Sequence, residues 1–125
     1  MAYDDNNVFA RILRGEIPAT KVYEDEYVLA FRDIAPQAPV HVLVIPKAGT
    51  ISTDDLSLDG VEPCGRLLHA VGHVARLLGL DKTGYRVIAN HGADAHQAVP
   101  HMHFHILGGG DLGPGLLPRR DQKQK

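Results

Sequence analysis

The sequence predicts an α+β domain built around a five-stranded, mainly antiparallel sheet. Five stretches are rich in β-branched and aromatic residues, whereas only two stretches carry apolar residues at helical spacing. Two of the connections between strands are too short for a crossover helix, so those strands pair antiparallel. With 125 residues the chain has room for one domain, residues 1–125, which we expect to be ordered over about 5–115 between a short acidic N-terminal tail and a basic C-terminal tail.

The first elements are a short helix and a hairpin. Residues 8–14 are predicted to be helical, because an asparagine at position 6 or 7 can cap the helix and Gly15 supplies a left-handed exit. Residues 21–34 place an acidic turn, 24–26, between two apolar runs, which is typical of an antiparallel hairpin.

The middle of the chain predicts a buried strand followed by the longer helix. Residues 40–46 form a nearly continuous β-branched run, as expected for a central strand buried on both faces, and a histidine at position 41 is conspicuous there. Residues 62–78 repeat apolar residues at steps of three and four, which predicts an amphipathic helix that ends at Gly79. The predicted apolar face consists of Leu67, Leu68, Val71, Val74, Ala75 and Leu78.

The last strands are predicted at residues 85–90 and 100–107, separated by a loop rich in small residues. The second of these strands contains three histidines at alternate positions. Because side chains alternate between the faces of a strand, the histidines share one face and the intervening apolar residues form the core face. The histidines are His101, His103 and His105, and the apolar residues are Met102, Phe104 and Ile106.

Composition excludes several classes of protein. No apolar run approaches the length of a membrane span, and the net charge of −2 gives no broad attraction to nucleic acid. The cluster at 119–125 is expected to be a solvated tail. The single cysteine, Cys64, and an N-terminus without the features of a secretory signal lead us to expect the cytoplasm.

The row of histidines allows three interpretations. It could be a polar strand face, a zinc site in which two of the histidines are ligands, or a catalytic row. Imidazole titrates near neutrality and its neutral nitrogen can attack phosphorus, so a central nucleophile with two flanking donors is a chemically sensible arrangement. His69 and His73, four residues apart on the predicted helix, lie in its polar stripe and are expected to be solvated.

The run from His101 to Leu107 fits the His-x-His-x-His signature and resembles the histidine triad (HIT) superfamily. Further stretches between about residues 5 and 115, among them "AFRDIAPQAPVHVLVIPK" and "GYRVIAN", are similar to its Hint branch, the histidine triad nucleotide-binding proteins. The resemblance implies a homodimer in which two five-stranded sheets join into one ten-stranded sheet, with the long helix at the interface. It also implies hydrolysis of purine nucleoside phosphoramidates and acyl adenylates. We expect no cofactor and no metal, and from the charge and hydropathy no nucleic acid or membrane partner.

Site residues follow from the same resemblance. His103 corresponds to the nucleophile that forms a nucleotidyl-histidine intermediate, His101 and His105 to the groups beside the phosphate, and His41 completes the cluster. Asp33 corresponds to the carboxylate that binds the ribose hydroxyls. The implied base pocket consists of Val8, Phe9, Ile12, Phe31, Ile34 and Leu43. Asn90 and Gln97 correspond to polar residues around the phosphate.

Several positions depart from the family pattern. His91 and His96 stand where acidic and glycine residues are common. Ala98 stands where a serine or threonine is usual shortly before the triad, so a hydroxyl donor is missing, and we expect slower turnover. Gly49 stands where a histidine is often found two residues after Pro-Lys. The alternatives left open are a dinucleoside polyphosphate hydrolase and a non-catalytic nucleotide-binding or zinc-binding protein, the latter using His101 and His103.

Overall fold

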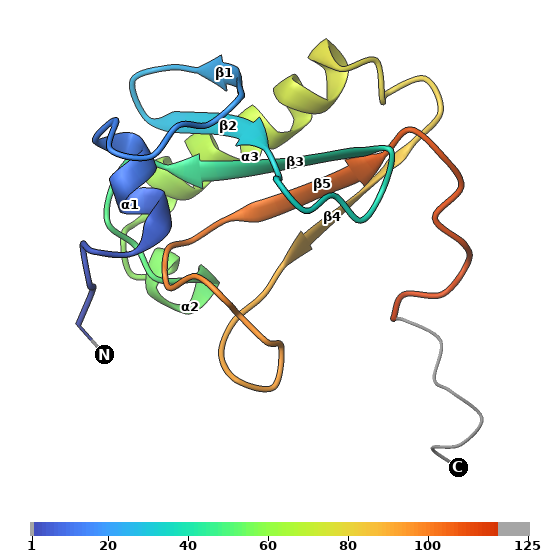
Figure 1. Cartoon of the computed structure of the whole chain (residues 1–125). Helices are drawn as coiled ribbons and strands as arrows, with labels where there is room; N and C mark the ends of the chain where they lie inside the picture. Colours follow the sequence, from blue (N-terminus) through green and yellow to red (C-terminus); the bar gives the residue numbers. More distant parts are fainter. Residues whose placement is uncertain (1, 118–125) are drawn as a thin grey trace.

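A computed structural model describes residues 2–117, which form one five-stranded sheet with helices on both faces (Figure 1). The order along the chain is α1, β1, β2, β3, α2, α3, β4 and β5. The helices are α1 (Val8–Leu13), α2 (Thr53–Leu56) and α3 (Val61–Leu77). The strands are β1 (Lys21–Glu24), β2 (Val28–Arg32), β3 (Val40–Pro46), β4 (Tyr85–Ala89) and β5 (Phe104–Gly108). The predicted α+β class is confirmed.

The strands lie in the order β1-β2-β3-β5-β4, and every neighbouring pair is antiparallel. β3 is therefore the central strand, as its continuous apolar sequence predicted. Its register with β5 places His41 opposite Leu107 and Leu43 opposite His105. Residues that face each other in such a ladder lie on the same side of the sheet, so this pairing brings the histidines of two distant segments together.

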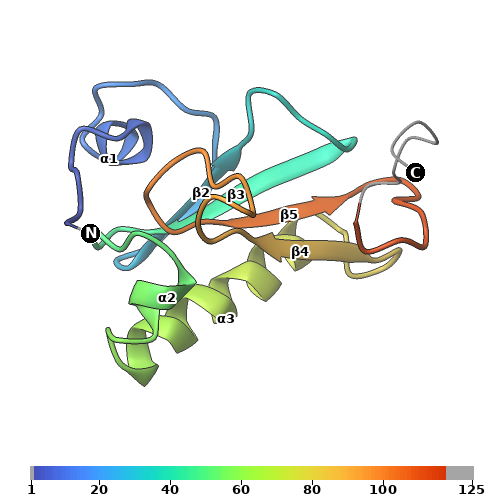
Figure 2. The same ribbon diagram turned by 90° about the horizontal axis from the view of Figure 1, so that it is seen from below.

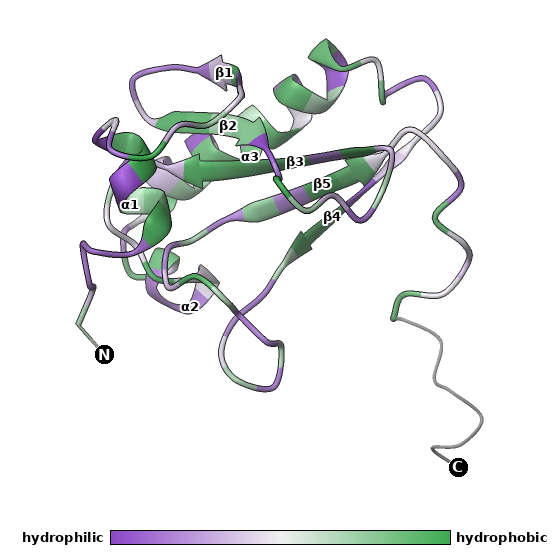
Figure 3. Ribbon diagram, in the orientation of Figure 1, coloured by the Kyte–Doolittle hydropathy of each residue, from purple (hydrophilic) through white to green (hydrophobic). Residues whose placement is uncertain are grey.

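The two faces of the sheet are covered by different helices, with α1 on one side and α2 and α3 on the other (Figure 2). The face toward α3 holds the larger apolar cluster, which includes Val42, Val44 and Ile106. The face toward α1 holds a smaller cluster around Phe9, Leu43 and Ile45. In Figure 3 the hydrophobic colour dominates β2 and β3, whereas the segment before α1 is mainly hydrophilic and the loop between β4 and β5 is mixed.

The cap of α1 has the predicted form. Asn7 is the N-cap, and its side-chain oxygen accepts a hydrogen bond of 2.9 Å from the Ala10 amide. Gly15 follows the helix with φ +79°, the left-handed conformation expected of a C-terminal glycine.

Three sequence predictions are wrong in detail. Leu68 is 60% exposed, because α3 buries only a narrow stripe against the sheet and position 68 lies beside it. The last strand begins at Phe104, because the ladders with β3 and β4 start there; in the segment before it, the Met102 amide donates to the carbonyl of Thr50 in a loop. The short helix α2, capped by Ser52, was not predicted; Ser52 followed by two aspartates was its only signal.

Within residues 2–117, no helix is long and apolar enough to cross a membrane. The basic cluster at 119–125, expected to be a solvated tail, lies outside the described residues.

Candidate active site

His103 is held with one ring nitrogen committed to the backbone and the other unbonded within the described residues. Its Nδ1 lies 2.7 Å from the carbonyl oxygen of His101. A carbonyl only accepts, so Nδ1 carries a proton and donates it, and the neutral ring has its lone pair on Nε2. The side chain is 7% exposed. His103 therefore presents a fixed nucleophilic nitrogen from a nearly buried ring.

His101 has a different situation, because both of its ring nitrogens have partners in the protein. Its Nε2 donates to the carbonyl oxygen of Pro46 at 2.8 Å, and its Nδ1 lies 2.6 Å from the Tyr3 hydroxyl. The residue is fully buried. In this arrangement His101 acts on the site through its carbonyl, which orients His103, and a direct contact of its ring with phosphate stays a prediction.

His41 and His105 form a hydrogen-bonded pair whose direction is set by the backbone. The amide of Gln37 donates to His41 Nδ1 at 3.1 Å, so that nitrogen is unprotonated and Nε2 carries the proton. His41 Nε2 lies 2.9 Å from His105 Nδ1 and donates to it. His105 is consequently the tautomer with its proton on Nε2, which is free to donate to a ligand.

Asp33 lies beside this pair, directly after β2. Its Oδ2 is 3.4 Å from His41 Nε2, and its Oδ1 accepts from the Ala35 amide at 2.8 Å. The side chain is 19% exposed, so it keeps accepting capacity toward a ligand. The carboxylate thus completes a cluster that the sequence placed only by resemblance.

Burial keeps the triad histidines neutral. Desolvation lowers the pKa of His101 and of His103 below the ordinary value of 6.5. The pKa of His105 is lowered to about 4, mainly by desolvation and to a smaller extent by the nearby His103 and His41. At neutral pH the site therefore offers an unprotonated nitrogen on His103 and an uncharged N–H donor on His105.

The rings pack closely enough to hold these orientations. The centroids of His103 and His105 are 5.0 Å apart, and those of His41 and His105 are 5.1 Å apart. Phe9 of α1 meets His103 edge to face at 5.0 Å. The packed rings thus hold the unbonded nitrogen of His103 beside the N–H donor of His105 in fixed orientations.

Most residues of the implied base pocket share one cluster on the α1 side of the sheet. Phe9, Phe31 and Leu43 are buried together, and Ile12 packs against them. Val8 and Ile34 are separate from this cluster, with exposed fractions of 39% and 99%. The contact of these six residues with a base stays a prediction.

The loop between β4 and β5 holds the remaining residues. The Gln97 amide nitrogen donates to the carbonyls of Ile51 and Val99, and its oxygen accepts from the Gly92 amide, so this side chain fastens the loop. Both amide protons are used in these bonds, and a contact with phosphate would require one of them to break. Asn90 is half-buried just beyond β4, and Ala98 is exposed.

One group of side chains in the described residues has the composition and spacing of a metal site. Ligand atoms of Asp33, His41 and His105 all lie within 4.8 Å of one another. The zinc hypothesis based on His101 and His103 fits less well, because both nitrogens of His101 and Nδ1 of His103 are hydrogen-bonded. Both ring nitrogens of His41 are also hydrogen-bonded, so a metal at the first group would replace one of these bonds.

Sequence reasoning missed two residues of the site. Gln37 fixes the tautomer of His41 through its backbone amide, which no side-chain pattern can indicate. Tyr3 bonds His101 across 98 positions of sequence. An aromatic residue directly before the polar run 4–7 was its only signal.

Comparison with known proteins agrees with this architecture. The family model described as HIT domain matches residues 14–112. An uncharacterised HIT-like protein of Azospirillum brasilense is 56% identical over 113 residues, covering 90% of this chain and 93% of the relative. The purine nucleoside phosphoramidase of Escherichia coli K12 is 41% identical over 112 residues, covering 90% of this chain and 94% of that protein.

Solved structures share the fold. A HIT family hydrolase from Clostridium thermocellum superposes with a TM-score of 0.86 at 43% identity, covering 91% of this chain and 99% of the other. Family model, relatives and structure agree along nearly the whole chain. The protein therefore belongs to the HIT family.

Proposed function

We propose that this protein hydrolyses purine nucleoside 5′-phosphoramidates and acyl adenylates to the nucleoside monophosphate through a nucleotidyl-histidine intermediate on His103. The observation that supports this most strongly is the tautomer of His103, whose Nδ1 is tied to the His101 carbonyl and whose Nε2 is left as a nucleophile. The similarity to a bacterial purine nucleoside phosphoramidase points to the same bond.

The reaction proceeds in two displacements. His103 Nε2 attacks the α-phosphorus, the phosphorus–nitrogen bond breaks, and its electron pair leaves with the amine, which takes a proton from solvent water. His105 Nε2–H donates to a phosphoryl oxygen as negative charge shifts there, while His41 holds His105 in the donating tautomer. Water then attacks the phosphorus and loses a proton to solvent; the bond to His103 breaks, its electron pair returns to Nε2, and the monophosphate is released.

The remaining residues bind the nucleoside. Asp33 accepts from the ribose hydroxyls, since an ionised carboxylate can accept from both at once. The apolar cluster at α1 takes the purine, and Asn90 and Gln97 lie nearer the phosphate. These roles follow the family resemblance and are consistent with the position of Asp33 at 3.4 Å from His41.

The decisive experiment follows AMP release from adenosine 5′-phosphoramidate by the wild type and by His103→Ala. We expect the variant to lose at least about 1,000-fold in kcat, because the covalent route is removed. His69→Ala serves as the matched control, since His69 is an exposed histidine on α3. Equal rates for wild type and His103→Ala would contradict the mechanism, and faster cleavage of a diadenosine polyphosphate would favour the alternative hydrolase.

A second candidate is zinc binding by Asp33, His41 and His105, favoured by the spacing of their ligand atoms. Two nitrogen ligands and a carboxylate leave a fourth position open on a tetrahedral zinc. Zinc added to the purified protein would then bind stoichiometrically, with binding lost in Asp33→Asn. Binding that survives this change, or no binding, would contradict the candidate.

The assembly that we propose is a homodimer in the cytoplasm. Val61 and Leu68 lie on one side of α3 and are 89% and 60% exposed. Apolar side chains grouped on one helix face favour contact with a second protein surface. β4 is an unpaired edge, and its residue Val87, opposite Ile106 on the α3 side, is 38% exposed. Sedimentation should give a dimer for the wild type and a monomer for Leu68→Glu; a monomeric wild type would contradict the proposal.

A further inference from the structure

The segment before α1 contacts one histidine of the site, His101, through Tyr3. The hydroxyl of Tyr3 lies 2.6 Å from His101 Nδ1, and the two rings meet edge to face with centroids 5.6 Å apart. The direction of the bond follows from the other side of the ring, where Nε2 donates to the Pro46 carbonyl. Neutral His101 therefore accepts at Nδ1, and Tyr3 donates.

The place of the Tyr3 ring depends on Gly49. A Cβ at position 49 would lie 2.8 Å from Tyr3 Cε2 and 2.9 Å from Cδ2, closer than carbon atoms normally approach. Position 49 is also where this chain lacks the histidine that the family often has. The Tyr3 ring thus occupies space that a side chain at position 49 would take, so the two residues are coupled.

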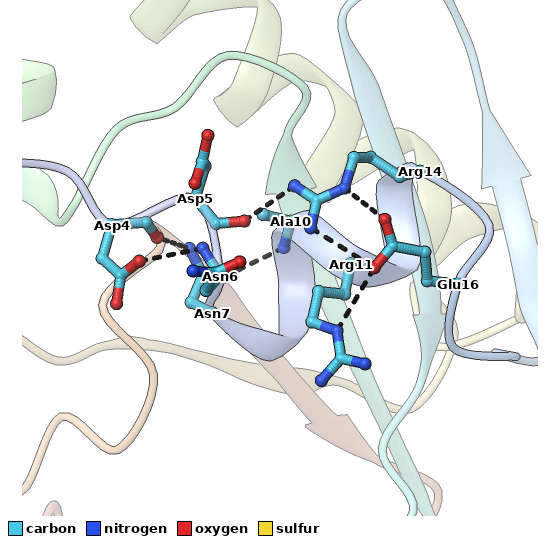
Figure 4. A network of polar contacts seen from close by, with 8 residues as sticks. All are labelled: Asp4, Asp5, Asn6, Asn7, Ala10, Arg11, Arg14 and Glu16. Atoms are coloured by element: carbon cyan, nitrogen blue, oxygen red, sulfur yellow. Dashed lines mark hydrogen bonds and ion pairs between the residues drawn. The ribbon is translucent and has the colours of Figure 1, made fainter.

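Residues 4–7 hold Tyr3 in place through a network of polar contacts with α1 and the turn that follows it (Figure 4). Asn7 Nδ2 donates to the Asp4 carbonyl at 2.7 Å, and the Asn7 oxygen caps α1. Arg14 donates to the Asp5 carbonyl at 2.7 Å and is itself paired with Glu16. The segment is therefore fastened at two points directly after Tyr3.

His101 in turn orients His103, the proposed nucleophile, through its backbone carbonyl. Its carbonyl receives the Nδ1–H of His103 at 2.7 Å, and the next amide, that of Met102, donates to the Thr50 carbonyl at 2.6 Å. His101 is fully buried, so losing the Tyr3 hydroxyl would leave Nδ1 without a partner in an apolar setting.

We propose that Tyr3 is a positioning residue for the hydrolysis: by donating to His101 Nδ1 it fixes the His101 ring and carbonyl, and thereby the orientation of His103 Nε2. This inference rests on the proposed function. Gly49 is the position that makes the arrangement possible, because only a residue without Cβ leaves room for the Tyr3 ring.

The first test is Tyr3→Phe, which keeps the ring and removes the hydroxyl. With adenosine 5′-phosphoramidate we expect kcat to fall about tenfold at unchanged KM, since a buried acceptor is left unpaired and the substrate contacts are untouched. In nitrogen NMR spectra of the unliganded protein, the His101 Nδ1 signal should move toward that of a nitrogen without a donor. The proton on His103 Nδ1 should also exchange faster with solvent.

The second test couples the two positions. Gly49→Ala should displace the Tyr3 ring and lower kcat about as much as Tyr3→Phe, and the double variant should lose little more than either single one, because both remove the same bond. Tyr27→Phe is the matched control, as Tyr27 lies on the surface under Arg66.

The outcomes separate this inference from the proposed function. In an active protein, an unchanged kcat in Tyr3→Phe, or additive losses in the double variant, overturns the role of Tyr3. A fall in kcat with unchanged proton exchange at His103 also overturns it. If the wild type releases no AMP, the proposed function fails, and proton exchange at His103 then decides alone whether Tyr3 orients that ring.

Discussion

The two faces of the sheet use neighbouring residues of the same strands for different purposes. On β3, Val42 and Val44 point toward α3 and are fully buried in apolar surroundings. His41 and Leu43 point toward α1, where the histidines meet. The face toward α3 contributes mainly to stability, whereas the face toward α1 carries the groups capable of chemistry.

The difference shows how polar residues can be buried at moderate cost. Burying an imidazole is unfavourable unless its nitrogens find partners. Among the described residues no buried side-chain nitrogen or oxygen lacks a hydrogen bond. His101, His103 and His41 each bond to a backbone group, so the tautomers that the proposed mechanism uses are also those that satisfy the buried nitrogens.

The largest expected effect concerns stability on the α3 face. Ile106→Ala removes a fully buried side chain, and we expect it to lower the free energy of unfolding by about 2–5 kcal/mol. Because the site lies on the other face, kcat below the melting temperature should change little. Urea unfolding together with AMP release measures both, with Leu58→Ala, 82% exposed, as control. A loss of activity without a loss of stability would break the distinction between the faces.

The reverse effect is expected on the α1 face. His105→Ala removes the Nε2–H donor, and we expect kcat to fall about 100-fold with a small change in melting temperature. His73→Ala, an exposed histidine on α3, should retain full activity. A His105→Ala variant as active as the wild type would mean that the His41–His105 pair does not assist the reaction.

Acid should lower the free energy of unfolding of the domain through His105, which lies on the α1 face. The pKa of His105 is about 4 in the folded protein, below its ordinary value of 6.5, so the unfolded chain binds more protons between these values. The free energy of unfolding should therefore be highest above pH 6.5 and fall by roughly 2–4 kcal/mol through this group as the pH drops toward 4. Urea unfolding of wild type and His105→Ala at several pH values measures the difference. If wild type and His105→Ala show the same pH dependence of unfolding, His105 is not the group responsible for this loss of stability.

The smallest expected effect lies in the loop beside the site. Ala98→Ser restores a hydroxyl that many family members have, and we expect phosphoramidate turnover to rise about fivefold, the equivalent of about 1 kcal/mol. The gain is modest because position 98 is exposed. Ala95→Ser, an exposed alanine in the same loop, should leave the rate unchanged. No gain in Ala98→Ser would show that the missing hydroxyl does not limit this enzyme.

Much of the fold followed from local patterns. Periodicity correctly indicated α1, the hairpin of β1 and β2, the central β3 and most of α3, because each pattern reflects one buried face. It could not tell that Leu68 is exposed, since the width of the stripe that α3 buries depends on the sheet beneath it. The start of β5 was also misplaced, because alternation continues through His101 and His103 although no strand pairs with them.

The sequence by itself determined that the histidines share one face, that Met102, Phe104 and Ile106 face the core, and, through family resemblance, which residues to consider. Only the tertiary structure decided which nitrogen each histidine offers. That choice depends on carbonyls and amides of Pro46, His101 and Gln37, whose positions are set by backbone packing. Every residue type carries these groups, so no sequence pattern records them.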